Sequence, residues 1–193
     1  MLDKKEFKAM SKNLAEASAM RDELSKTSRD IVKLTKKLIF ALHRRDLDEA
    51  AKLERDLSRN YNGFIKLTKK KPALGLNGPW AVAVQEYVEA ESYYKFIVEK
   101  KIPSRKKLDV NTELYVTGLC DLSGELVRKA LDDVICGRTA EALIIKNLLS
   151  EMYGALLDFN PEGELRKKID MVRWNLTKLE DTMFEVSIRG RLS

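Results

Sequence analysis

Two pairs of acidic residues lie at helical spacing within mostly apolar segments. Glu86 and Glu89 are three residues apart, and Asp121 and Glu125 are four residues apart. On helices, these spacings bring the members of each pair onto one face. Carboxylate oxygens are the ligands that hard divalent cations prefer, so two such faces packed together would form a site for Mg²⁺ or Mn²⁺. The spacing therefore indicates a candidate metal centre between two helices.

Ion pairing is the alternative explanation for these four acids. A buried carboxylate needs a cationic partner, a proton or a metal ion. Arg128, Lys95 or the basic residues of the first predicted helix would serve as such partners. A di-iron centre is disfavoured because such sites use Glu-x-x-His pairs, and His43 is the only histidine in the chain.

The composition predicts an all-α protein. The 193 residues include only 9 Gly and 4 Pro, and 34% of them are charged, which is typical of a mostly helical chain. We expect residues 1–193 to form a single domain, an antiparallel bundle of about six helices with a long first and a long last helix. No apolar run approaches the roughly 18 residues of a membrane span, and we expect no signal peptide because residues 1–6 are mostly polar. We therefore expect a cytoplasmic protein with no membrane contact.

Helical periodicity runs nearly end to end and is interrupted by short turns. The expected helices cover approximately residues 4–44, 46–70, 79–101, 110–135, 139–159 and 160 onward. Asp46, Thr139 and Asn160 are the predicted N-caps, and Gly137 suits the position that follows a helix. Residues 71–72 and 76–79 form a predicted break.

Two glycines lie inside the helix predicted at 110–135, namely Gly118 and Gly124. Each weakens a helix by about 1 kcal/mol relative to alanine. We therefore expect the backbone of a neighbouring element to approach closely at these positions.

Long apolar stripes follow the first and last predicted helices. The first stripe is interrupted by the polar residues Arg21, Ser28 and Thr35. The last one alternates spacings of four and three, which is typical of a coiled-coil seam: Leu165, Ile169, Val172, Leu176, Leu179, Met183 and Val186. This seam either packs inside the bundle or lies partly between subunits. The length of both helices favours a homo-oligomer.

Basic residues are the candidates for binding a polyanion, and the net charge is +6. Those predicted to contact nucleic acid are Arg21, Arg29, Lys33, Lys36, Lys37, Arg44, Arg45, Lys69, Lys70 and Arg128. Together they would read a phosphate backbone in a salt-sensitive way. For any one of them, a solvated surface charge is the simpler interpretation, and Arg128 also has the spacing to pair with Glu125.

Segments of four predicted helices, in the same order along the chain, resemble the translin superfamily. They are residues 28–31 and 39–44 in the first helix, 83–90 in the third, 118–128 in the fourth and 184–190 in the last. Ala83 stands where the superfamily pattern has leucine. The resemblance extends over most of the chain. Because all four acidic positions are filled, it points to the Trax (translin-associated factor X) branch, although residues 187–190 look more like translin.

The resemblance implies a metal-dependent endoribonuclease that cleaves single-stranded RNA. It implies that Glu86, Glu89 and Asp121 are the catalytic, metal-binding residues, with Glu125 as a fourth. It also implies a homo-oligomer of up to eight subunits, forming a closed shell with its basic and catalytic surfaces inside. The short link at residues 103–109 suggests a compact, archaeal homologue.

Two further functions stay open at this point. One is a non-catalytic, translin-type scaffold that binds single-stranded RNA or DNA, in which the acids are structural. The other is a helical interaction protein that binds no nucleic acid. RNA binding measured at increasing salt distinguishes the interaction protein from the two functions that involve nucleic acid. Binding through a basic face weakens steeply as salt rises.

Overall fold

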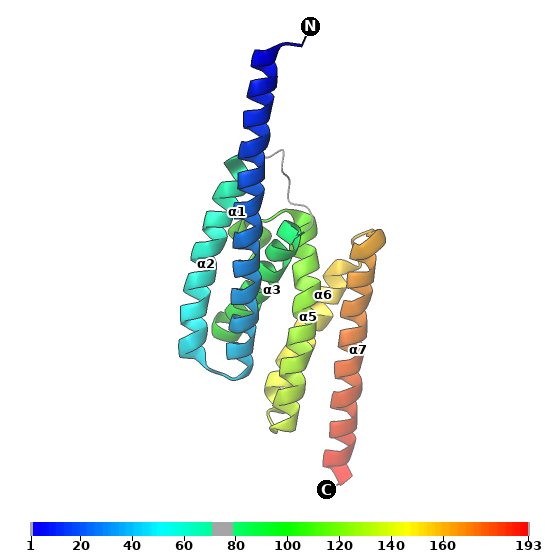
Figure 1. The fold of residues 1–193 in the computed structure, drawn as a ribbon. Coiled ribbons are helices and arrows are strands. Elements are labelled where there is room, and N and C mark those ends of the chain that lie inside the picture. The colour runs from blue at the N-terminus through cyan, green and yellow to red at the C-terminus, as the bar shows by residue number, and fades with distance from the viewer. Residues whose placement is uncertain (1, 71–78, 193) are drawn as a thin grey trace.

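The computed structural model describes residues 2–70 and 79–192 of the chain. Within these ranges the protein contains seven α-helices and no strand (Figure 1): α1 (Lys4–His43), α2 (Leu47–Lys70), α3 (Pro79–Glu99), α4 (Arg105–Leu108), α5 (Thr112–Ile135), α6 (Thr139–Leu156) and α7 (Gly163–Leu192). The predicted all-α class is confirmed, as are the long first and last helices, which have 40 and 30 residues.

Local signals explain most of the helix ends. The Asp46 carboxylate accepts a hydrogen bond from the Glu49 backbone N–H at 3.1 Å, which confirms it as an N-cap of α2. Gly137 follows α5 with a φ of 75°, a left-handed conformation that favours glycine. Asn111 caps α5 through a 2.8 Å bond from the Leu114 backbone N–H.

Two predicted helix starts are wrong. Arg138, not Thr139, is the residue before α6, and it makes no side-chain cap. Helix α7 begins at Gly163, so Asn160 and Pro161 precede it. Gly163 has a φ of 59°, and a right-handed helix cannot continue through that conformation. The predicted break at residues 71–72 and 76–78 lies outside the described residues.

The helices form two groups that meet at α3 and α5. Helices α1, α2 and α3 pack on one another, as do α5, α6 and α7, and α3 packs on α5 (Figure 1). Helices α1 and α3 run in the same direction, because Thr35 contacts Glu86 and, further along both helices, His43 contacts Tyr93. The colours of Figure 1 show that α5 and α7 also run in one direction, with α6 returning between them.

The contact between α3 and α5 is closest at Gly118. A Cβ atom added there would lie 2.6 Å from Val88 Cβ and 2.8 Å from the Gln85 carbonyl oxygen, well inside the usual separation of about 3.5–4.0 Å between carbon atoms. The predicted close approach is therefore confirmed at Gly118. It is wrong at Gly124, where the nearest atom, Asn175 Nδ2, lies at 3.9 Å.

The apolar stripes of the two long helices have different surroundings. The N-terminal part of α1 extends beyond the rest of the protein (Figure 1), so Phe7, Met10 and Leu14 are exposed. On α7, the middle of the predicted seam is buried within the chain, from Ile169 to Leu179. Packing inside the bundle therefore accounts for this part of the seam. Within the described ranges, no helix has the length and apolar character needed to cross a membrane.

Candidate metal centre

The four predicted acids lie together where α3 meets α5. Burial raises the pKa of the Glu89 carboxyl to about 8. The nearby carboxylates of Glu86, Asp121 and Glu125 contribute further to this raised pKa, in that order. An opposite charge at the centre of the group would relieve this repulsion. We refer to Glu86, Glu89, Asp121 and Glu125 as the acidic cluster.

Three members of the acidic cluster have a polar partner on another helix. Thr35 Oγ1 on α1 lies 3.2 Å from Glu86 Oε2. The Lys168 ammonium on α7 forms an ion pair with Asp121 Oδ1. These contacts show that the helices of both groups reach the acidic cluster.

Glu125 is held by the single histidine of the chain. His43 Nε2 contacts Glu125 Oε2, and the Tyr93 hydroxyl lies 3.4 Å from His43 Nδ1. The Arg128 guanidinium lies 3.7 Å from the same Glu125 oxygen, which confirms the predicted pairing. Lys95, the other expected partner, instead pairs with Glu99 at 2.9 Å.

The donor set fits a hard divalent cation, although the side chains are now turned toward protein partners. Four carboxylates offer only oxygen ligands, which suit Mg²⁺ or Mn²⁺. Among residues 2–70 and 79–192, no three acidic, histidine or cysteine side chains are arranged to hold one ion. An ion held by three or more of these carboxylates would therefore require some of their side chains to rotate.

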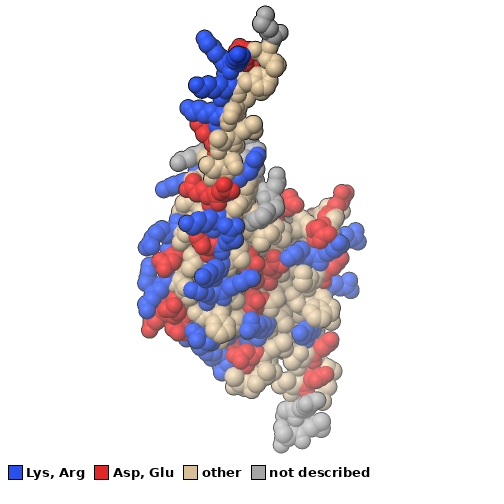
Figure 2. Space-filling view, in the orientation of Figure 1, with Lys and Arg blue, Asp and Glu red and all other residues tan. Residues whose placement is uncertain are grey.

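A basic groove lies between α1 and α3, close to the acidic cluster. Arg29, Lys33 and Lys36 of α1 and Val82 of α3 line it, with a cavity volume of about 530 Å³. Val82 is one helical turn before Glu86. Figure 2 shows many Lys and Arg side chains over α1 and α2, interspersed with acidic ones, and further acidic side chains toward the α5–α7 group. Three of the residues predicted to contact nucleic acid therefore line one groove, and its α3 side lies one helical turn from Glu86.

The other predicted basic contacts are scattered. Arg21 and Lys37 are exposed on α1. Arg45 pairs with the fully buried Asp133 at 2.7 Å, so it has a structural role. Lys69 pairs with Asp109 at 2.6 Å, and the side chain of Lys70 lies outside the described residues.

Arg44, the remaining basic candidate, lies at the end of α1. Its guanidinium is 4.9 Å from the centre of the Phe40 ring and 3.7 Å from Asp46. The side chain is mostly exposed, so these contacts leave it accessible to a polyanion.

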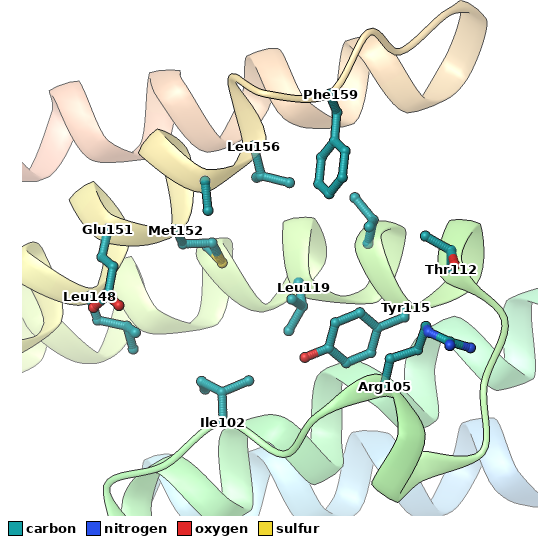
Figure 3. Close-up of a pocket in the computed structure, with 12 residues that line it drawn as sticks. Ile102, Arg105, Thr112, Tyr115, Leu119, Leu148, Glu151, Met152, Leu156 and Phe159 are labelled. Carbon is teal, nitrogen blue, oxygen red and sulfur yellow. The ribbon is translucent and has the colours of Figure 1, made fainter.

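An apolar cavity of about 420 Å³ lies away from the acidic cluster, between α5, α6 and the segment before α5. Figure 3 shows Tyr115, Leu119, Met152 and Phe159 pointing into it. None of the four acids lines this cavity. It therefore has no part in a metal centre.

Sequence reasoning missed three partners of the acidic cluster: Thr35, His43 and Lys168. Thr35 did leave a signal, as a polar residue in the apolar stripe of α1. His43 left no signal of its contact with Glu125, which lies on another helix, although its side chain is only 10% exposed. Lys168 left no signal, because nothing in the sequence places α7 beside Asp121.

Fold and acidic cluster together define an all-helical protein with two acidic helix faces packed against each other. The chain belongs to the Translin family, whose sequence pattern matches residues 19–190. An uncharacterized protein of Methanocaldococcus jannaschii is 31% identical over 169 residues, covering 86% of this chain and 75% of the relative. Translin-associated protein X of Pongo abelii is 25% identical over 226 residues, covering 95% of this chain and 78% of the relative.

Solved structures share the fold over nearly the whole chain. The crystal structure of apo-NeC3PO has a TM-score of 0.88 and 29% identity, covering 96% of this chain and 98% of that one. AfC3PO, solved in a complex with duplex RNA, has a TM-score of 0.87 and 23% identity, covering 95% and 97%.

Proposed function

We propose that this chain is a metal-dependent endoribonuclease that cleaves single-stranded RNA as a homo-oligomer. The observation that carries the proposal is the acidic cluster, in which repulsion from three neighbouring carboxylates helps to raise the Glu89 pKa to about 8. Gathering four carboxylates at one helix crossing is unfavourable unless counter-charges or a bound ion compensate them. The names of relatives agree with a nucleic-acid role, since AfC3PO was solved with duplex RNA.

The acidic cluster is the proposed holder of Mg²⁺ or Mn²⁺. When bound, such an ion polarises a phosphate oxygen and lowers the pKa of a water molecule. Glu86 and Glu89 come from α3, and Asp121 and Glu125 come from α5. Thr35 and His43 orient the carboxylates of Glu86 and Glu125, as outer partners of metal ligands commonly do.

The basic groove is the proposed RNA path. Phosphates bound by Arg29, Lys33 and Lys36 would place the strand one helical turn from Glu86. A single strand can bend from such a groove into the acidic cluster, whereas a duplex is stiff. The groove contacts are charges, so they would position the backbone without reading sequence.

Cleavage of an end-labelled single-stranded RNA tests the proposal. Wild-type protein is assayed with Mg²⁺, with Mn²⁺ and with EDTA, beside a duplex of the same sequence. Glu89→Gln and Asp121→Asn should each lose at least a hundredfold in rate, because each removes a ligand charge. Glu99→Gln is the matched control on α3, since Glu99 pairs with Lys95 outside the acidic cluster. Full cleavage by Asp121→Asn would contradict the assignment.

A non-catalytic scaffold that binds single-stranded RNA or DNA is the second candidate. It is favoured by the present partners of Glu86, Asp121 and Glu125, which account for these acids without an ion. Tight, salt-sensitive RNA binding without metal-dependent cleavage would establish this function in place of the first.

A further inference from the structure

The side-chain ammonium of Lys168, on α7, contacts the acidic cluster at Asp121. It lies in the second turn of α7, next to Ile169, which is buried in a small apolar group with Val116, Cys120 and Val172. This packing fixes the α7 backbone against α5. The Lys168 ammonium therefore has a defined position beside Asp121, with which it pairs.

The charge of Lys168 acts on more than one acid. Lys168 lowers the pKa of Glu89 against the effects of burial and of three carboxylates, so its field reaches across the acidic cluster. The Lys168 side chain is 33% exposed, and that of Asp121 is 24% exposed. Both groups are thus partly shielded from water, which strengthens their interaction relative to a surface pair.

The neighbouring Lys167 provides a contrast. It pairs with Glu164 of its own helix at 2.6 Å, and both side chains are more than 70% exposed. Such a pair contributes little to stability. The two lysines are adjacent in sequence, and only Lys168 faces the acidic cluster.

We propose that Lys168 is a positioning residue that acts as a tethered cation: it neutralises Asp121 in the metal-free protein and competes there with the divalent ion. This inference rests on the proposed metal centre and adds a determinant of its affinity. An ion that takes Asp121 as a ligand must displace the Lys168 ammonium or bind beside it. Either event opposes binding, by loss of the ion pair or by repulsion between cations.

Mn²⁺ binding to the metal-free, full-length protein tests this inference, measured by the electron paramagnetic resonance signal of free Mn²⁺. Lys168→Met should bind Mn²⁺ about tenfold more tightly than wild type, the size expected for losing one partly exposed ion pair. Lys168→Gln should behave in the same way, because it also lacks the charge. Lys168→Arg should keep wild-type affinity, and Lys167→Met is the matched control.

Thermal melting gives a second measure that does not depend on activity. In EDTA, Lys168→Met should melt at a lower temperature than Lys167→Met, because the acidic cluster has lost its counter-charge. Saturating Mn²⁺ should raise its melting temperature more than that of wild type. Circular dichroism at low temperature checks that each variant is folded.

The outcomes separate the two proposals. If wild type binds Mn²⁺ in a way that Asp121→Asn abolishes, but Lys168→Met and Lys168→Gln bind no more tightly, Lys168 is not a competing cation and the inference falls alone. If wild type, Lys168→Met and Asp121→Asn all fail to bind Mn²⁺, both the metal centre and the inference fall.

Discussion

Alanine at Gly118 should separate the two helices that carry the acidic cluster. The new Cβ would lie 2.6 Å from Val88 Cβ and 2.8 Å from the Gln85 carbonyl oxygen. Relief to an ordinary contact requires α3 and α5 to move apart by about 1 Å. Neither contact is with the flexible end of a side chain, so a rotamer change cannot relieve them.

The magnitude follows from two opposing effects. Replacing a helical glycine with alanine stabilises by about 1 kcal/mol, and overpacking of this kind destabilises by about 1–3 kcal/mol or more. Gly124→Ala is the matched control on α5, because its Cβ would meet nothing closer than 3.9 Å. The helix gain is common to both variants, so Gly118→Ala should be less stable than Gly124→Ala by the overpacking alone, about 1–3 kcal/mol.

Urea unfolding followed by circular dichroism measures this difference, at one protein concentration because association affects the midpoint. Mn²⁺ affinity should also fall at least tenfold in Gly118→Ala, since metal sites tolerate displacements of only about 0.5 Å. If Gly118→Ala is as stable as Gly124→Ala, the close contact between α3 and α5 does not exist as described.

Three further predictions concern other residues. Thr35→Val removes the group 3.2 Å from Glu86 Oε2 and should weaken Mn²⁺ binding about tenfold in a titration. The double change Lys33→Gln and Lys36→Gln should weaken RNA binding. The negative slope of the logarithm of the RNA association constant against log salt should become shallower by about two. Burial raises the Glu91 pKa to about 7, so ionisation between pH 4.5 and 7 opposes folding. Wild-type stability should therefore fall as pH rises through this window, and Glu91→Gln should remove up to about 3 kcal/mol of that fall in urea titrations.

Each of these predictions has a control. Thr117→Val makes the same change at a threonine that bonds the Glu113 backbone, and it should keep Mn²⁺ affinity. Lys52→Gln removes an exposed α2 lysine and should leave the salt slope nearly unchanged. Glu99→Gln should keep the wild-type fall in stability toward pH 7, because the exposed Glu99 pairs with Lys95, which lowers its pKa and leaves it already ionised through most of this window. Equal effects of test and control variants would contradict the corresponding argument.

Helix positions were predictable because their signals are local. The Asp46 side chain bonds the backbone three residues later, and Gly137 adopts its left-handed conformation at the end of its own helix. The spacing of the four acids also fixed which members share a face. These features depend only on neighbours within one or two helical turns.

The partners of the acids were not predictable, because they depend on how separate helices pack. Thr35, His43 and Lys168 come from α1 and α7, 47 or more residues away in sequence from the acids they contact. No spacing rule relates such positions. The predicted start of α7 was wrong for a different, local reason: Gly163 has a positive φ, and the helix begins there instead of at the capping pattern of Asn160 and Pro161.

The two-group packing of the helices has a consequence for folding. Glu86 and Glu89 belong to the α1–α3 group, and Asp121 and Glu125 belong to the α5–α7 group. Each group is built from helices close in sequence, which favours fast, local assembly. The four carboxylates come together only where the two groups pack on each other. A divalent ion bound there would cross-link the two groups and stabilise them against separate unfolding. Slower amide hydrogen exchange at the α3–α5 contact in the presence of the ion would measure this stabilisation.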